Sequence, residues 1–132
     1  MPAKVGYLVI DAADPERLAP FWCGLLATGV DVTIGDGEFL VLAPTEDGLT
    51  VGFQRVPEAK AGKNRLHLDL VVDDLDEATA EVEKLGGQWL EPGNTRELEG
   101  FRWRCMADPE GNEFDIDVLP PGEPVIDGEG PG

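Results

Sequence analysis

Histidine, cysteine and basic residues are scarce in this chain, and each shortage narrows the classes of function to consider. The 132 residues include 1 His, 2 Cys and 10 Lys+Arg, against 27 Asp+Glu, which gives a formal net charge of −17. So acidic a chain is repelled by nucleic-acid phosphates and by anionic membrane surfaces, and neither is expected as a partner. The charge is compatible with a cationic ligand, and its simplest interpretation is solubility.

Long apolar runs and several catalytic motifs are missing as well. No window approaches the roughly 20 apolar residues of a membrane span, and Asp11 interrupts the first apolar stretch too early for a signal peptide. Cys23 and Cys105 are far apart and have no Cys or His nearby. They are therefore predicted to be reduced core thiols of a cytoplasmic protein. The motifs of serine hydrolases, phosphate-binding loops and dinucleotide-binding folds are absent.

What the sequence does contain is an internal repeat. The stretch YLVIDAADPERLAPFWCGLL, which begins at Tyr7, aligns with HLDLVVDDLDEATAEVEKLG, which begins at His67. Each stretch starts with a strand-like run, continues with a helix-capping Asp14 or Asp74, and ends in an apolar stripe at helical spacing. The strand-like runs that follow are VDVTI, EFLVLA and LTVGFQRV in the first half, and QWLE, FRWRCMA and EFDIDVL in the second.

The predicted fold class is therefore α+β, with two βαβββ modules in tandem. Module 1 spans about residues 4–57, a linker covers 58–64, and module 2 spans about 65–119. Together they would form one domain over residues 1–119, followed by a tail rich in Pro and Gly at residues 120–132.

This pattern resembles the glyoxalase, bleomycin-resistance and dioxygenase group, the vicinal oxygen chelate superfamily. The resemblance rests on the paired modules, on HLDLVVDD at the start of the second module and on DPEGNEFDI at its end, over roughly residues 4–119. The chain looks most like the small glyoxalase-like domains. The resemblance implies that the two modules curl into a cupped, half-barrel mixed sheet, with helices outside and a small-molecule site in the cup.

The resemblance also implies metal-ligand positions on the first and last strand of each module, at Tyr7, Gln54, His67 and Asp115. The repeat selects the same four positions when the last strands are aligned. His67, Asp115 and Gln54 are the predicted ligands of one divalent metal (Zn, Ni, Fe or Mn), because a neutral phenol such as that of Tyr7 is a poor ligand. The alternative is a site without metal.

Strand alternation extends the predicted pocket. Asp69 shares a face with His67, and Glu113 and Asp117 share a face with Asp115. Trp103, in FRWRCMA, could stack on a flat or cationic ligand. The predicted ligand pocket consists of Tyr7, Gln54, His67, Asp69, Trp103, Glu113 and Asp115. The alternative for the acidic residues is a solvated strand face. The alternative for His67 is a histidine that is hydrogen-bonded to a neighbouring carboxylate, and the alternative for Trp103 is core packing. Tyr7 could equally be a pocket wall or a hydrogen-bond donor.

Four functions are compatible with these residues. The first is a metal-dependent lyase, isomerase or dioxygenase, in which the ion acts as a Lewis acid. The second is a metal-free protein that sequesters a cationic or aromatic compound, as bleomycin-resistance relatives do. A scaffold that has lost its site and a metal-free acid–base pair of His67 and Asp115 are the others. The sequence identifies no catalytic residue and leaves open whether the protein is an enzyme. A homodimer is expected, because in many relatives a symmetric dimer shares each site between two chains. In other relatives both modules of one chain close a single site, and the sequence leaves both arrangements open.

Overall fold

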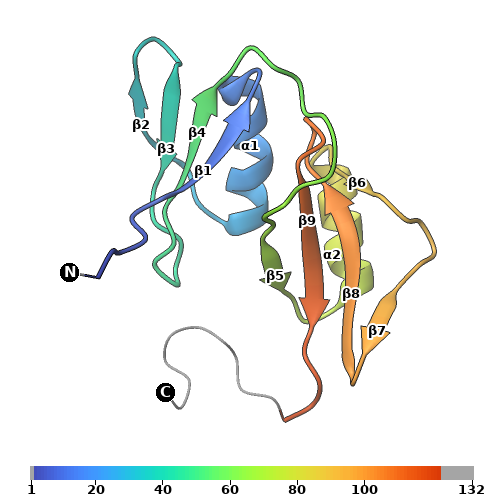
Figure 1. Ribbon diagram of the computed structural model, residues 1–132. Helices are drawn as coiled ribbons and strands as arrows, with labels where there is room; N and C mark the ends of the chain where they lie inside the picture. Colours follow the sequence, from blue (N-terminus) through green and yellow to red (C-terminus); the bar gives the residue numbers. More distant parts are fainter. Residues whose placement is uncertain (1, 123–132) are drawn as a thin grey trace. The chain divides into compact units, whose positions relative to one another are not determined.

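The computed structural model describes residues 2–122, so most of the predicted tail lies outside the described residues. The chain divides into two compact units at the junction between Ala61 and Gly62. In each unit a helix packs on one face of an open mixed sheet, as Figure 1 shows. The predicted α+β class with mixed sheets is therefore confirmed, whereas a cup shared by the two modules stays a prediction.

The first unit follows the predicted βαβββ order. Its elements are β1 (Leu8–Ala12), α1 (Pro15–Leu26), β2 (Val30–Ile34), β3 (Phe39–Leu42) and β4 (Val51–Arg55). The strand order is β1-β4-β3-β2, with β1 parallel to β4 and the other pairs antiparallel. Asp14 caps α1 as predicted, because its Oδ1 accepts a hydrogen bond from the backbone N of Arg17 at 3.4 Å.

Side chains of the first unit are divided between a packed face and an open face. The core, at most 3 % exposed, includes Leu18, Phe21 and Trp22 of α1 and Leu40, Leu42, Val51 and Phe53 of the sheet. The buried residues Leu18, Phe21 and Trp22 thus lie in the stretch where the sequence predicts an apolar stripe at helical spacing. The exposed side chains of this unit include Tyr7, Val9, Val32 and Ile34.

The second unit has one strand more than predicted. Its elements are β5 (Asp69–Val71), α2 (Leu75–Lys84), β6 (Gln88–Trp89), β7 (Arg96–Leu98), β8 (Phe101–Ala107) and β9 (Glu113–Val118). The order is β5-β9-β8-β6, with β7 also paired to β8, and β5 is parallel to β9. The additional strand is β7, and β5 starts two residues after His67 rather than at it.

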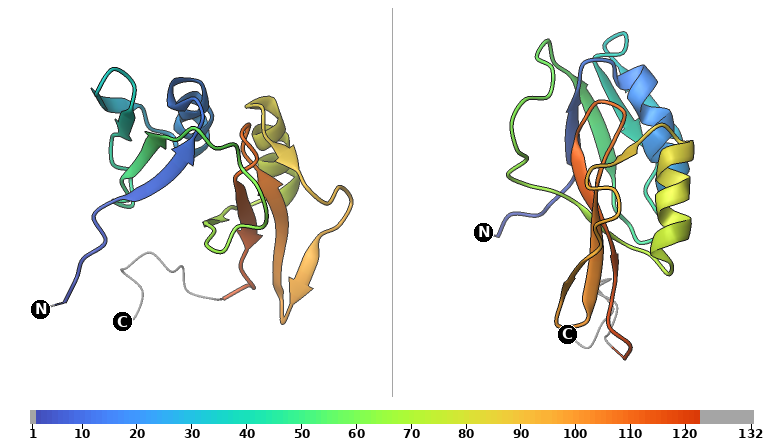
Figure 2. Two further views of the ribbon diagram at one scale, coloured as in Figure 1. Left: turned by 45° about the horizontal axis from the view of Figure 1, so that its top comes forward. Right: turned by 90° about the vertical axis from the view of Figure 1, so that its right-hand side faces the viewer.

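A tight turn explains the unpredicted strand. Glu99 and Gly100 both adopt positive φ, at 49° and 88°. Two such residues suit a two-residue hairpin, which folds β7 back onto β8 with Leu98 opposite Phe101. Figure 2 shows the two strands of this hairpin side by side.

The helix of the second unit is held by apolar packing and by one arginine. Leu75 and Val82 of α2 and Met106, Phe114 and Ile116 of the sheet are at most 3 % exposed. The Arg104 guanidinium donates to Thr79 Oγ1 at 2.8 Å, and its carbon lies 4.3 Å from the centre of the Trp89 ring. Figure 2 shows α2 on one face of β8 and β9. Neither helix of the described part is long and apolar enough to cross a membrane.

Candidate functional site

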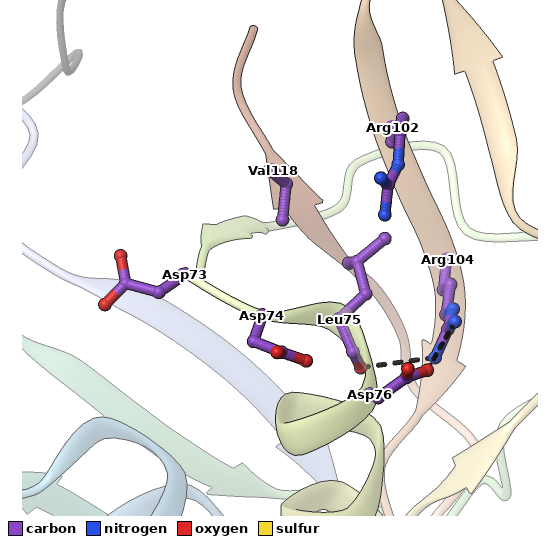
Figure 3. Close-up of a pocket in the computed structure, with 7 residues that line it drawn as sticks. All are labelled: Asp73, Asp74, Leu75, Asp76, Arg102, Arg104 and Val118. Atoms are coloured by element: carbon purple, nitrogen blue, oxygen red, sulfur yellow. Dashed lines mark hydrogen bonds and ion pairs between the residues drawn. The ribbon is translucent and has the colours of Figure 1, made fainter. Parts of the chain in front are cut away.

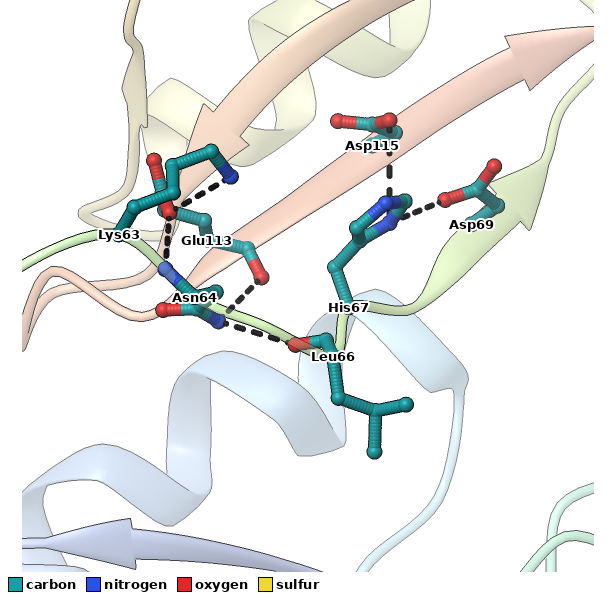
Figure 4. A network of polar contacts seen from close by, with 7 residues as sticks. All are labelled: Lys63, Asn64, Leu66, His67, Asp69, Glu113 and Asp115. Atoms are coloured by element: carbon teal, nitrogen blue, oxygen red, sulfur yellow. Dashed lines mark hydrogen bonds and ion pairs between the residues drawn. The ribbon is translucent and has the colours of Figure 1, made fainter.

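His67 lies two residues before the first residue of β5 and between two carboxylates, as Figure 4 shows. Its Nδ1 is 2.6 Å from Oδ1 of Asp69 and 3.9 Å from Oδ2 of Asp115. Asp69 and Asp115 are direct partners in the parallel pairing of β5 with β9, so their side chains leave the same face of the sheet. One imidazole nitrogen and two carboxylate oxygens lie within 4.8 Å of one another as a result.

Strand register shows which other side chains share this face. Cys105 is the β8 partner of Asp115, and Trp103 is the β8 partner of Asp117. Phe114 and Ile116, which alternate with the acids, are buried. The alternation expected on β9 is thus confirmed. We call the side of the second sheet that carries His67, Asp69, Asp115 and Asp117 the acidic face.

The negative charges of the carboxylates on the acidic face are only partly balanced by the positively charged groups around them. Burial raises the pKa of Asp115, the charge of Asp69 raises it further, and His67 opposes both. Burial raises the pKa of Asp117 to about 7, assisted by its hydrogen bond with Asp69 and by the charges of Asp69 and Asp115. Oδ1 of Asp117 is buried and has no hydrogen-bond partner among the described residues. A cation bound here would relieve this excess of negative charge.

Cys105 lies half-buried on this face, not in the core as predicted. Burial raises the pKa of its thiol to about 11, and the charge of Asp115 contributes. A thiol that keeps its proton is a weak nucleophile and a weak ligand. Cys23 is also half-buried, and neither cysteine forms a disulfide. The signal that could have placed Cys105 on this face is its spacing from Trp103, because residues two apart on a strand lie on the same face.

Glu113, predicted in the pocket, holds the segment that leads to His67. Its Oε1 accepts hydrogen bonds from Lys63 Nζ at 3.0 Å and from the backbone N of Asn64 at 2.8 Å. Nδ2 of Asn64 donates to the backbone oxygens of Glu113 at 3.2 Å and of Leu66 at 3.3 Å. Figure 4 shows these contacts beside His67. They fasten residues 63–66 to the start of β9.

An arginine–glutamate pair beside this face was missed at the sequence level. Arg96 is the β7 partner of Trp103, and its Nε and Nη2 donate to the Glu91 carboxylate at 2.9 and 2.7 Å. The pairing places Arg96 on the far side of Trp103 from Asp117. No signal indicated this position, because no strand was predicted over β7.

Tyr7 and Gln54 belong to the first unit. Tyr7 directly precedes β1 and is 61 % exposed. Gln54 lies on β4 opposite Asp11 and is exposed. The roles assigned to them, pocket residue for Tyr7 and metal ligand for Gln54, stay predictions.

A separate hollow of about 270 Å³ lies at the start of α2 (Figure 3). It is lined by Asp73, Asp74, Leu75, Asp76, Arg102, Arg104 and Val118. Arg104 is already paired with Asp76 at 2.9 Å. By strand alternation Arg104 and Asp115 lie on opposite sides of the sheet, so this hollow is distinct from the acidic face.

The donors around His67 fit a divalent cation. One imidazole and two carboxylates suit Zn²⁺, Ni²⁺, Fe²⁺ or Mn²⁺. Metal–ligand bonds of about 2 Å bring donor atoms to roughly 3–4 Å from each other, so modest side-chain rotation would close a set that spans 4.8 Å. The side chains of His67 and Asp69 are 43 % and 45 % exposed, which leaves room for a further ligand.

Comparison with known proteins bears on the fold and on the family. The family model described as "Glyoxalase-like domain" matches residues 7–116. A search of curated proteins found no match. A glyoxalase/bleomycin resistance protein/dioxygenase family enzyme from Burkholderia phytofirmans PsJN has a similar structure, with a TM-score of 0.72 and 17 % identity over 89 % of this chain and 99 % of that one.

Two other solved structures are similar. A glyoxalase-related enzyme from Fulvimarina pelagi has a TM-score of 0.70 and 17 % identity over 98 % of this chain and 97 % of that one. The fosfomycin resistance protein FosX from Mesorhizobium loti has a TM-score of 0.68 and 18 % identity over 89 % of this chain and 93 % of that one. At such identities these structures establish the fold alone.

Proposed function

The chain belongs to the family of glyoxalase-like domains, and on that premise we propose that the acidic face binds a small molecule through a divalent cation. His67, Asp69 and Asp115 would hold the cation. The observation that carries the proposal is the convergence of one imidazole and two carboxylates on one exposed face. Members of the wider superfamily typically bind small molecules, which agrees with the kind of ligand proposed for this site.

The chemistry of the site would follow from its charges. A divalent cation, when bound, supplies Lewis-acid stabilisation of negative charge on substrate oxygens. Asp69 and Asp115 offer the negative charge that holds a cation, and His67 offers a neutral nitrogen. The protein would then be a metal-dependent lyase, isomerase or dioxygenase. Gln54 is retained as a proposed additional ligand, because its counterpart in the repeat is Asp115.

A second candidate function is capture of an organic cation without metal or chemistry. The observation that favours it is the raised pKa of Asp115 and Asp117, which burial causes first and repulsion between the carboxylates second, because any cation bound there would stabilise their charged forms. Trp103, opposite Asp117, offers a cationic ligand an aromatic neighbour. The two functions differ in whether a metal ion is needed for binding.

Metal binding decides between them. Protein purified without a histidine tag, stripped with EDTA and dialysed, is titrated calorimetrically with Mn²⁺, Zn²⁺, Ni²⁺ and, without oxygen, Fe²⁺. We expect about one equivalent of at least one ion to bind. The variants His67→Ala, Asp69→Asn and Asp115→Asn each remove one proposed metal-binding side chain. Each should weaken the binding of the ion at least about tenfold. Gln54→Ala tests the additional ligand.

The matched control is Asp73→Asn, which removes an equal charge from an exposed loop next to α2. It should leave the affinity within about twofold, because a solvated charge off the face contributes little. Failure of all four ions to bind would reject the metal-dependent function. Binding of tetramethylammonium to that protein, weakened by Asp115→Asn, would then establish capture of an organic cation.

The expected homodimer and cytoplasmic location are also proposals. The free thiols of Cys23 and Cys105 agree with a reducing compartment. Light scattering coupled to size-exclusion chromatography tests the dimer. A mass near 14.2 kDa, that of one chain, would contradict it.

A further inference from the structure

The acidic face continues into an apolar surface at the β7–β8 hairpin. Phe101 and Trp103 alternate with Arg102 on β8, so they share the side of the sheet that carries Cys105. Leu98 is the cross-strand partner of Phe101 and therefore lies on the same side. Leu98 and Phe101 are 65 % and 39 % exposed. We call Leu98, Phe101 and Trp103 the apolar platform.

The apolar platform lies directly beside the acidic cluster, by which we mean the four side chains of the acidic face, His67, Asp69, Asp115 and Asp117. Trp103 is the cross-strand partner of Asp117, and the next pair along the same two strands is Cys105 with Asp115. On the other side of Asp117, β5 places Val71, which is 50 % exposed. A molecule whose polar end lies at Asp115 would therefore extend over Trp103 toward Phe101.

We propose that the apolar platform is the subsite for a flat apolar or aromatic body, attached to a polar head that the acidic cluster holds. The inference rests on the proposed function, and it adds the class of ligand. The head is either a pair of oxygens that binds a divalent cation at His67, Asp69 and Asp115, or an organic cation. In both cases the ligand has an uncharged body of about one ring, which matches three contiguous side chains.

Size and charge argue against a macromolecule as the occupant. A stable protein interface buries about 800 Å² on each partner, which is far more than three side chains offer. A second copy of this chain that docked through the same face would bring its own carboxylates against Asp115 and Asp117, and these like charges would repel one another. A small ligand with a cationic or metal-binding head removes that repulsion instead.

Matched ligand pairs test the platform. Benzohydroxamate and acetohydroxamate, which carry the same chelating head, are titrated into metal-loaded protein. Benzyltrimethylammonium and tetramethylammonium, which carry the same cationic head, are titrated into EDTA-treated protein. We expect the aromatic member of at least one pair to bind about tenfold or more tightly than its methyl counterpart, since a ring stacked on Trp103 buries apolar area.

Variants test whether the apolar platform is the source of this affinity advantage, which is the ratio of the aromatic ligand's affinity to that of its methyl counterpart. Trp103→Ala should reduce it to about twofold or less, and Leu98→Ser, at a well exposed position, should reduce it partly. Trp103→Phe should retain most of it. The control is Leu66→Ala, because Leu66 is 78 % exposed and lies on the segment before His67. This control should leave the advantage unchanged.

The outcomes separate this inference from the proposed function. If both members of each pair bind equally, the platform is overturned while the acidic site stands. If an aromatic ligand binds as well to Asp115→Asn as to the wild type, the link between platform and acidic cluster is overturned. If no head group binds in either arm, the proposed function fails, and the inference that rests on it falls with it.

Discussion

Asp117 lies in surroundings that disfavour its charged form, because it is partly buried and lies beside other carboxylates. Its Oδ1 is buried and has no hydrogen-bond partner among the described residues, and burial raises its pKa to about 7. The groups that face it are Asp69 and Asp115, which raise this pKa, and His67, which lowers it. In the unfolded chain a carboxyl of this kind has a pKa of about 4. The folded protein therefore binds a proton here that the unfolded chain releases.

The stability of the metal-free protein should fall as the pH rises from about 5 to 8. In this window the folded state binds more protons than the unfolded state, so the free energy of unfolding decreases with pH. Because Asp117 is about half-buried, solvent screening limits the effect to on the order of 1–2 kcal/mol. Asp117→Asn should flatten the dependence, since an amide can donate to Asp69 without a charge. Urea unfolding in EDTA across this range measures it.

The control for this experiment is again Asp73→Asn, which should keep the wild-type slope because Asp73 lies on an exposed loop. Equal slopes for Asp117→Asn and the wild type would show that this carboxyl does not retain its proton in the folded protein.

At the scale of elements, the segment before β5 depends on β9 for its position. Glu113 binds Lys63 and the backbone of Asn64, and Asn64 returns a hydrogen bond to the backbone of Glu113. His67 follows this segment and precedes the first residue of β5. We infer that Glu113 is a positioning residue for His67, although it was predicted to line the pocket.

Glu113→Ala should release this segment. The lost hydrogen bonds correspond to about 1–2 kcal/mol of stability, and amide exchange over residues 64–68 should accelerate. If a metal binds, its affinity should fall roughly tenfold. Glu113→Gln, which keeps an acceptor for Asn64, should restore most of the protection. Faster exchange confined to this segment in Glu113→Ala distinguishes positioning from general destabilisation, whereas unchanged exchange would contradict the role.

Elements with strong local signals could be predicted, and elements set by distant partners could not. Asp14 and Asp74 cap their helices as the sequence indicates, because capping depends on residues three positions away. The strand β7 was missed, because NTRELEG has no alternating apolar pattern and its pairing partner is β8. The turn at Glu99 and Gly100 forms from an unremarkable Glu-Gly pair.

The same distinction applies to the candidate site, where some residues could be predicted from local patterns and others depend on distant partners. The repeat placed His67 on the first strand and Asp115 on the last strand of the second module, and strand alternation added Asp69. Their contacts agree with that grouping. Side-chain pairings such as Arg96 with Glu91 could not be predicted, because they depend on a hairpin that the sequence pattern does not indicate.

For the whole molecule, the dominant property is its net charge of −17. Self-repulsion on this scale favours the expanded, unfolded chain. At pH 7.5, an increase in NaCl from about 20 mM to 500 mM should therefore raise the melting temperature by roughly 3–5 °C, since salt screens exposed charges. Differential scanning fluorimetry measures the shift.

The same salt series near the isoelectric point gives the control. At about pH 4.1 the net charge approaches zero, so added salt should leave the melting temperature nearly unchanged. A salt effect of equal size at both pH values would attribute the stabilisation to salting-out of apolar surface instead of to charge screening.

Packing and chemistry occupy opposite sides of the strand β9. Phe114 and Ile116 are buried in the core, while Asp115 and Asp117 take part in the candidate site. Substitutions at the second set can therefore alter ligand preference at little cost to folding. Natural selection can explore new specificities on such a strand one residue at a time, and directed evolution of this chain should begin at the same alternate positions.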